Sequence, residues 1–134
     1  MPQITLHHAS IITKDLKQSL SFYRNVFGLV EVPRPAFAVA GAWLACGDLQ
    51  LHLIANLDGS FRRSSSVDPS DWHFAFRTAD FDAFVGHLQG MGFDEDLPDS
   101  DPKFMLLLRE SPAGFPQLYL RDPDRNIIEV NGTR

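Results

Sequence analysis

The stretch His-Phe-Ala-Phe-Arg-Thr-Ala-Asp-Phe at residues 73–81 repeats the pattern of His-Ala-Ser-Ile-Ile-Thr-Lys-Asp-Leu at residues 8–16. A constant offset superposes three identities, which pair His8 with His73, Thr13 with Thr78 and Asp15 with Asp80. Each stretch is a β-rich run that leads through possible N-cap residues into a helical pattern. Internal repetition constrains a fold more than any local signal does. We therefore predict two related halves, against the alternative of two unrelated strand–helix units that share a cap by chance.

The first half continues with a helix and two strands. Apolar residues recur at intervals of three or four from Leu16 to Phe27, which predicts a helix, and Gly28 follows where a C-cap glycine belongs. Thr13 or Asp15 is expected to cap its start. Two strands are predicted at Ala42–Cys46 and Leu49–Ile54, joined by a hairpin-type turn.

The second half likewise continues with a helix, followed here by three strands. A helix is predicted at Phe81–Gln89, and Gly92 after it corresponds to the C-cap glycine of the first half. Strands are predicted at Lys103–Glu110, Gln117–Arg121 and Asn126–Asn131. Because the last of these occupies the place of Leu49–Ile54 in the first half, Glu129 corresponds to His52.

The sequence thus predicts an α+β fold of two tandem βαβββ modules that form a curved mixed sheet. The modules span about residues 4–55 and 71–131, and the Ser-containing segment 56–70 joins them. A chain of 134 residues has the usual size of one domain, so we expect residues 1–134 to form a single domain.

The composition excludes several classes of protein. An apolar share of 44% and a charged share of 22% are typical of a globular protein, and no run approaches the ~20 apolar residues of a membrane span. A net charge of −5 disfavours nucleic acid as a partner. The N-terminus lacks the basic and then apolar run of a signal peptide, which predicts a cytoplasmic protein. With one cysteine, a Cys-rich zinc site is excluded, so a metal would need His, Asp or Glu ligands.

Strand alternation sets a few polar residues apart from the core. Because successive side chains point to opposite faces, the apolar residues of the predicted strands share one face and leave His52, His73 and Glu129 on the other. In the strand predicted at Trp72–Arg77, Trp72 is expected on the apolar face. His8 fits less cleanly, because both faces of its strand are mixed.

The four residues occupy matching positions in the two repeats. Taken singly, a strand histidine is usually hydrogen-bonded in a partial core, and a glutamate on a last strand is usually solvated. Four such groups on one inner face without a partner would each cost roughly 1–3 kcal/mol. Neutral imidazoles and a carboxylate suit zinc, nickel, iron(II), cobalt or manganese. We therefore predict one divalent ion held by His8, His52, His73 and Glu129.

Four segments together resemble the vicinal oxygen chelate superfamily, which includes glyoxalase I, fosfomycin-resistance thiol transferases, methylmalonyl-CoA epimerase, extradiol dioxygenases and bleomycin-binding proteins. They are Leu-His-His-Ala at residues 6–9, the segment 15–29 with its Phe-Tyr-Arg-Asn-Val-Phe-Gly-Leu ending, Trp-His-Phe-Ala-Phe at 72–76, and Arg-Asp-Pro-Asp-Arg-Asn-Ile-Ile-Glu-Val at 121–130. The resemblance implies a glyoxalase-like fold, and it places that family's metal ligands on the same four residues.

The resemblance also implies a glyoxalase I-like lyase or isomerase that acts on a small substrate with two adjacent oxygens. The ion would serve as a Lewis acid, and Glu129, the single carboxylate among the four ligands, is the expected base. Phe37, Trp43 and Phe104 are candidates for the substrate pocket, with ordinary core packing as the simpler explanation. Arg121 is a candidate for binding a substrate carboxylate, although an ordinary surface position is the simpler expectation for it.

Two residues depart from the pattern of these relatives. Glyoxalase I more often has Glu at the position of His52. Many relatives have Gly at the position of Arg125, where a positive φ would cost arginine roughly 1–2 kcal/mol, unless Asn126 takes that conformation instead.

Three other activities stay open at this level. A metal-free binding or resistance protein need not keep the four ligand-type residues. An iron(II) extradiol-type dioxygenase would use His8, His73 and Glu129, and His52 would then occupy a position that oxygen chemistry needs open. A thiol transferase differs from the lyase mainly in its substrate. Relatives of this length commonly form homodimers, so the site is expected either within one chain or shared across a dimer.

Overall fold

The computed structural model describes residues 1–133 and consists of two compact units. The first module comprises Met1–Phe61, and the second module begins at Arg62. Both modules have the order strand, helix and three further strands, and each forms a four-stranded mixed sheet. The predicted α+β fold of two βαβββ modules is thereby confirmed. In the part of the chain that the structure describes, no helix has both the length and the apolar character needed to cross a bilayer.

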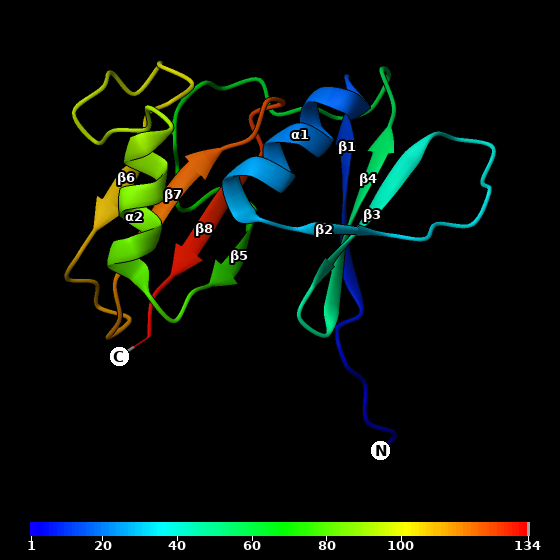
Figure 1. The fold of residues 1–134 in the computed structure, drawn as a ribbon, viewed down its shortest axis with the longest axis horizontal. Helices are drawn as coiled ribbons and strands as arrows, with labels where there is room; N and C mark the ends of the chain where they lie inside the picture. Colours follow the sequence, from blue (N-terminus) through cyan, green and yellow to red (C-terminus); the bar gives the residue numbers. More distant parts are fainter. Residues whose placement is uncertain (134) are drawn as a thin grey trace. The chain divides into compact units, whose positions relative to one another are not determined.

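The sheet of the first module has the order β1-β4-β3-β2 (Figure 1). Its elements are β1 (His8–Thr13), α1 (Leu16–Phe27), β2 (Val30–Val32), β3 (Gly41–Cys46) and β4 (Leu49–Ala55). Strand β1 pairs with β4 in parallel, and the other pairings are antiparallel. The crossover through α1 makes the parallel pairing possible, because parallel neighbours need a long connection.

The first helix begins and ends where the sequence predicts. The Asp15 carboxylate accepts the backbone N–H of Gln18 at 3.0 Å, so Asp15 is the N-cap. Thr13 instead places its hydroxyl 2.6 Å from that of Ser19, where both side chains are buried. At the other end Gly28 has φ 67, a left-handed conformation that glycine adopts without a steric penalty.

The two faces of the first sheet differ in character. Helix α1 packs against β4 and β3, whose helix-facing residues Leu51, Leu53 and Leu44 are 2% exposed or less. Burying side chains of this size contributes about 1.5–3 kcal/mol each. On the opposite face Trp43 pairs with His52 across the strands.

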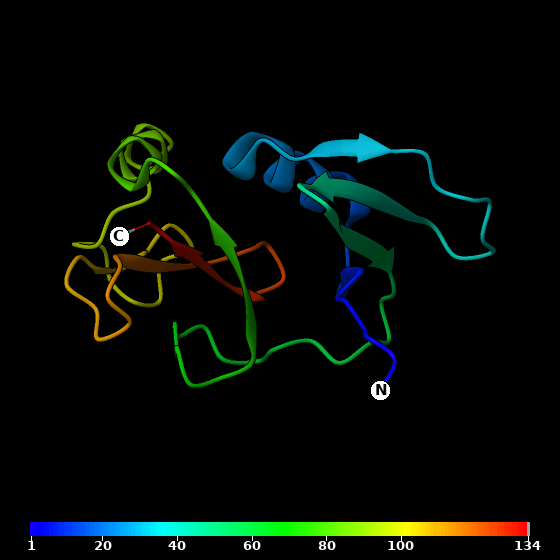
Figure 2. The ribbon, with the colours of Figure 1, turned by 90° about the horizontal axis from the view of Figure 1, so that it is seen from below.

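The sheet of the second module has the equivalent order β5-β8-β7-β6. Its elements are β5 (His73–Arg77), α2 (Phe81–Gly90), β6 (Leu106–Leu108), β7 (Gln117–Arg121) and β8 (Ile127–Asn131). Figure 2 shows α2 nearly end-on, lying on one side of this sheet. Leu88 of the helix and Leu118, Leu120 and Ile128 of the strands are fully buried, so this side holds the core of the module.

The registers of the two sheets are equivalent. In the parallel pairs, Ser10 lies opposite His52, and Ala75 lies opposite Glu129. His8 and His73 therefore stand two residues before the partner of the second ligand-type residue in each module. Parallel partners share a face of the sheet, so the register places His8 on the same face as His52, which the mixed pattern of its strand did not predict.

Most predicted strand bounds differ from the structure by at most one residue, and two predictions concerning Phe104 and Trp72 are wrong in a way that bears on the site. The strand predicted at residues 103–110 shrinks to β6, because Asp101 caps a turn by accepting the N–H of Lys103 at 2.8 Å. Phe104 is left with an isolated bridge to Asp94. Trp72 precedes β5 and is 68% exposed, since its N–H is bound by the Asp71 carboxylate at 2.8 Å rather than by a neighbouring strand.

Candidate metal centre

The first module brings His8 and His52 together from two adjacent strands. Their rings stack with centroids 4.0 Å apart and planes 16° from parallel. On the other side of His52 lies Trp43, with ring centroids 4.4 Å apart and planes 5° from parallel. His8 is exposed, whereas His52 is only 6% exposed. The first pair is thus a stack of flat rings with one open end.

His52 is held as a neutral imidazole. Its Nε2 lies 2.8 Å from Oε1 of Gln50, which is two residues away on the same strand and face. Burial lowers the pKa of His52, and the nearby His8, His7 and Arg34 lower it further. A neutral ring is the form that coordinates a metal.

His7 lies closer to the first pair than strand alternation suggests. Its Nδ1 is 2.8 Å from Nδ1 of His8, and its ring centroid is 6.4 Å from that of His52. Strand alternation alone would place the His7 side chain on the opposite face from His8. Strand β1 begins at His8, so the alternation that governs a strand does not reach His7.

The second module brings His73 and Glu129 together. Nε2 of His73 is 3.1 Å from Oε2 of Glu129, and Nδ1 of the same ring is 2.8 Å from the backbone oxygen of Asp71. Because a carbonyl oxygen can only accept, Nδ1 carries a proton, which leaves the Nε2 lone pair facing a carboxylate oxygen. Two groups that face each other in this way are completed by a proton or by a metal ion.

The other oxygen of Glu129 is held by donors from β7. Oε1 accepts a hydrogen bond from the Tyr119 hydroxyl at 3.0 Å and another from the Gln117 amide. Burial, followed by the hydrogen bond and the charge of Glu129, raises the pKa of Tyr119 to about 12. Tyr119 therefore keeps its proton at neutral pH and remains a donor to Glu129. The Ser111 hydroxyl in turn donates to the Gln117 side-chain oxygen.

The residues present fit a divalent ion. Imidazole nitrogens and a carboxylate oxygen are ligands that zinc and its neighbours accept, and each module contributes two of them. Within either module, no three His, Cys, Asp or Glu side chains among residues 1–133 are arranged to hold a metal by themselves. Each module by itself offers two of the four residues predicted as ligands.

The predicted substrate-binding residues fall into two groups. In the first module Phe37 is 55% exposed and lies against Trp43, with ring centroids 6.1 Å apart. The Arg34 guanidinium lies 4.8 Å over the Phe37 ring. In the second module Arg121 is 5% exposed and donates to the backbone oxygen of Asp101, so the expected surface position is wrong. Phe104 is half-buried.

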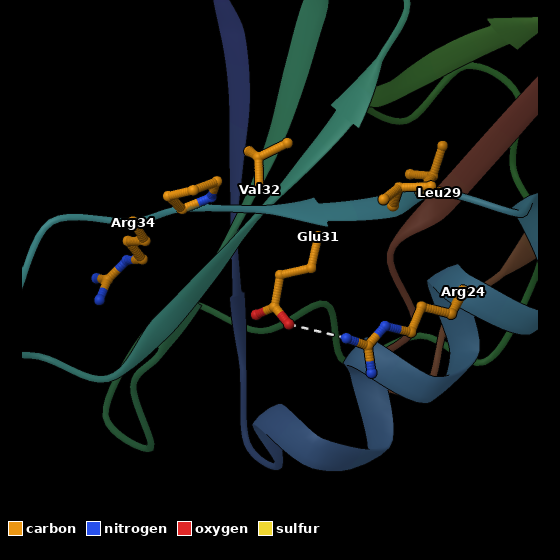
Figure 3. Close-up of a pocket in the computed structure, with 7 residues that line it drawn as sticks. Arg24, Leu29, Glu31, Val32 and Arg34 are labelled. Atoms are coloured by element: carbon orange, nitrogen blue, oxygen red, sulfur yellow. Dashed lines mark hydrogen bonds and ion pairs between the residues drawn. The ribbon is translucent and has the colours of Figure 1, made fainter.

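A separate cavity of about 720 Å³ lies along the edge strand β2 (Figure 3). Its lining runs from Leu29 to Arg34 and includes Arg24 of α1. The Arg24 guanidinium binds the Glu31 carboxylate at 2.8 Å across it. None of the four predicted metal ligands lines this cavity, so it is distinct from the candidate centre.

Arg125 adopts the strained conformation that its position predicts. Its φ is 68, and it is the single non-glycine residue among those described with a positive φ. Its guanidinium donates to the backbone oxygen of Arg63, a contact that glycine could not make. This hydrogen bond offsets part of the backbone strain.

The family model described as Glyoxalase/Bleomycin resistance protein/Dioxygenase superfamily matches residues 5–130. The chain belongs to this superfamily. The match covers both modules and both ligand-type pairs, so the predicted resemblance is confirmed.

Several known proteins are similar to the chain in sequence or in fold. A protein of Arabidopsis thaliana named Glyoxylase I 4 is 27% identical over 128 residues, which cover 94% of this chain and 69% of that protein. A glyoxalase family protein from Bacillus anthracis superposes with a TM-score of 0.77 at 19% identity, covering 100% of this chain and 98% of that one. The lactoylglutathione lyase of Agrobacterium tumefaciens has a TM-score of 0.69 at 23% identity, over 98% and 96% of the two chains. These structural likenesses show the fold.

A fosfomycin resistance protein, FosX of Listeria monocytogenes, shares the fold with a TM-score of 0.71 at 17% identity, over 100% of this chain and 95% of that one. That structure contains Mn(II) and 1S,2S-dihydroxypropylphosphonic acid. Proteins of the same fold therefore include one that is complexed with a divalent metal.

Sequence reasoning missed the residues that hold the ligand-type side chains in place. Gln117 and Tyr119 alternate with Leu118 and Leu120 along β7, and this signal could have placed them on the face of Glu129. Asp71 gave no such signal, because its contribution to the site is a backbone oxygen.

Proposed function

We propose that this superfamily member is a metal-dependent lyase or isomerase of the glyoxalase type. The observation that carries the proposal is the equivalence of two donor pairs, His8 with His52 and His73 with Glu129, at matching registers of the two sheets. One divalent ion, among Zn, Ni, Fe, Co and Mn, would be held by all four residues. The two pairs would come either from one chain or from the two chains of a homodimer.

The substrate proposed for this centre is a small molecule with two adjacent oxygens. A bound divalent ion would supply Lewis-acid polarisation of those oxygens. Two proteins of the same fold support this class, since one is a lactoylglutathione lyase and the other is complexed with a dihydroxy compound.

Glu129 is the residue proposed to move the proton. Its Oε1 is occupied by the Tyr119 hydroxyl and the Gln117 amide, which leaves Oε2 for the ion or for a substrate proton. The carboxylate is 8% exposed, so water competes little for that oxygen. Positioned general bases of this kind typically contribute about 100- to 10,000-fold to a rate.

The organic part of the substrate is proposed to bind beside the first pair. Trp43 and the exposed face of Phe37 provide flat apolar surface next to His52, and Arg34 adds a cation above Phe37. In the second module Arg121 lies on the same face of β7 as Tyr119 and could meet a substrate carboxylate. Phe104 is the remaining candidate for the pocket wall.

The test combines metal analysis with a substrate panel. After purification without chelators, the protein is expected to bind about one divalent ion per site formed by four ligands. Turnover is then measured with glutathione hemithioacetals, epoxides with and without thiols, and catechols. Isomerisation of a hemithioacetal supports the proposal. Absence of a stoichiometric ion would establish a metal-free binding protein instead, while oxygen uptake with a catechol or thiol addition to an epoxide would establish the dioxygenase or the transferase.

A further inference from the structure

The segment from Arg62 to Asp71 is organised around one buried arginine. The Arg62 side chain is 9% exposed. Its Nε donates to the Asp71 carboxylate at 2.8 Å, and its Nη1 donates to the backbone oxygens of Ser64, at 2.9 Å, and Ser66. A segment that the sequence indicated only as a Ser-rich joining region is therefore folded around a single guanidinium.

Two further contacts fix this segment to the rest of the second module. The Asp99 carboxylate accepts the backbone N–H of Val67 at 3.1 Å. The Arg125 guanidinium donates to the backbone oxygen of Arg63 from the turn before β8. The segment is thus anchored at both of its flanks and at its centre.

Asp71 connects Arg62 to the candidate metal centre. Its carboxylate binds Arg62 through one oxygen and the Trp72 N–H through the other, at 2.8 Å each. Its backbone oxygen is the acceptor for Nδ1 of His73 at 2.8 Å. With the carboxylate held on both oxygens, the peptide that carries the acceptor has a fixed orientation.

The direction of this acceptor decides which tautomer His73 adopts. A proton on Nδ1 leaves the lone pair on Nε2, which points to Glu129 Oε2. The opposite tautomer would place a proton where a metal ion binds. A ring nitrogen that coordinates a metal usually has its tautomer set in this way by the hydrogen bond of the other nitrogen.

We propose that Arg62 is a positioning residue for His73, acting through Asp71 to fix the tautomer in which Nε2 binds the ion. This inference rests on the proposed metal function for its purpose, and on the hydrogen bonds of the second module alone for its geometry. Arg62 touches neither ligand; its effect passes through the carboxylate and the backbone oxygen of Asp71.

The experiment compares four variants of the full chain with the unaltered protein. Arg62→Met removes the guanidinium, Arg62→Lys keeps a charge but offers one nitrogen for three acceptors, and Asp71→Asn keeps the backbone oxygen while weakening the ion pair. Arg63→Met is the matched control, since Arg63 is an exposed neighbouring arginine whose side chain lies outside this chain of contacts. Long-range ¹H–¹⁵N correlation spectra of the metal-free proteins report the tautomer of His73, and competition with a chromophoric chelator reports the affinity for Zn²⁺.

The expected result is a mixed His73 tautomer and about a tenfold loss of Zn²⁺ affinity in Arg62→Met, the lower end of the effect of outer contacts on a metal site. The Zn²⁺ affinities of Arg62→Lys and Asp71→Asn should lie between those of Arg62→Met and the unaltered protein. Arg63→Met should match the unaltered protein in both affinity and His73 tautomer. A double variant at Arg62 and Asp71 should bind Zn²⁺ no more weakly than Arg62→Met alone, because both substitutions remove the same set of contacts.

An unchanged His73 tautomer in folded Arg62→Met, or an equal effect of Arg63→Met, would overturn the inference. If Arg62→Met does not fold, Arg62→Lys and Asp71→Asn decide by the same readouts. If the unaltered protein binds no Zn²⁺, the proposed function fails, while the tautomer spectra still decide the role of Arg62.

Discussion

The two donor pairs share a backbone register but are held by different forces. In the first module, His8 and His52 belong to a stack of rings that Trp43 closes on one side. In the second, His73 and Glu129 are fixed by hydrogen bonds from Asp71 and Tyr119. The two modules thus share the backbone positions of these residues, but different contacts orient the side chains in each module.

The difference follows from the chemistry of the second residue in each pair, an imidazole in the first module and a carboxylate in the second. A buried carboxylate needs hydrogen-bond donors, and β7 supplies two of them to Oε1 of Glu129, from the Tyr119 hydroxyl and the Gln117 amide. A neutral imidazole needs little more than one acceptor and a flat neighbour, and Gln50 and Trp43 supply these. Trp43 and Tyr119 occupy corresponding positions, since Trp43 lies opposite His52 and Tyr119 lies opposite Glu129.

The largest expected effect separates the two pairs by their chemical role. Glu129→Gln should leave metal bound, because three imidazoles remain, while turnover falls about 100- to 10,000-fold with the loss of the base. The measurement is kcat on the substrate found in the panel, together with metal content. Glu95→Gln, at an exposed glutamate, is the control. Retained turnover in Glu129→Gln would remove Glu129 from the role of base.

Tyr119→Phe tests whether hydrogen bonding holds the second pair. Deleting the hydroxyl removes a hydrogen bond to a charged group, so the free energy of unfolding of the metal-free protein should fall by about 1.5–3 kcal/mol. Urea denaturation gives this quantity. A change below 0.5 kcal/mol, roughly the effect of a neutral surface substitution, would show that the carboxylate is satisfied without Tyr119.

Trp43→Leu tests whether ring stacking holds the first pair. Ring stacking contributes about 0.5–1.5 kcal/mol beyond the buried area, so the free energy of unfolding should fall by about 1 kcal/mol through the loss of the stack. His52 should also become more mobile, which ¹⁵N relaxation of its ring can detect. Stacking is not what orients His52 if its ring stays fixed in Trp43→Leu.

The protonation of His52 should make the metal-free first module sensitive to pH. The pKa of His52 is lower in the folded protein than in the unfolded chain, so below the unfolded value of about 6.5 the unfolded chain binds more protons. Stability should therefore fall as pH decreases from about 6.5 toward the folded pKa, and should be independent of His52 above that window. Denaturation midpoints of the unaltered protein and of His52→Gln across pH 5 to 8 check this; parallel curves would contradict it.

The smallest effect is expected at the turns that join the last two strands of each module. Gly47 has φ 56 in the first turn, and Arg125 has φ 68 in the second. Arg125→Gly should relieve about 1–2 kcal/mol of backbone strain and lose a hydrogen bond worth about 1 kcal/mol, so the net change in stability should be within about 1 kcal/mol of zero. Thermal denaturation provides the measurement, with Arg63→Met as the control. A loss well above this range would show that the contact with Arg63 outweighs the strain.

Much of the fold could be predicted from local patterns. The helix Leu16–Phe27 and the strand Gln117–Arg121 were predicted with the bounds that the structure has, because apolar spacing and a C-cap glycine, or strict alternation, define them. Phe104 was placed in a strand although it lies outside β6, since the turn capped by Asp101 is a hydrogen-bonding choice that apolar spacing does not report.

The candidate site was predictable only in part. Register, which brings Ser10 opposite His52 and so puts His8 on its face, depends on pairing between strands far apart in sequence. Arg121 was expected at the surface but is buried, with its guanidinium donating to the backbone oxygen of Asp101. No sequence motif predicts this hydrogen bond.

The sequence by itself determined the duplication, the order of elements in each half and the four residues that correspond between them, because repetition and periodicity are properties of the linear chain. Tertiary structure alone decided how these side chains are held: the ring stack around His52, the donors on Glu129 and the path from Arg62 to His73. The physical reason is that side-chain orientation depends on hydrogen bonds and ring contacts between segments. Every residue carries a backbone oxygen, so the sequence does not mark the one, that of Asp71, which accepts the His73 hydrogen bond after folding.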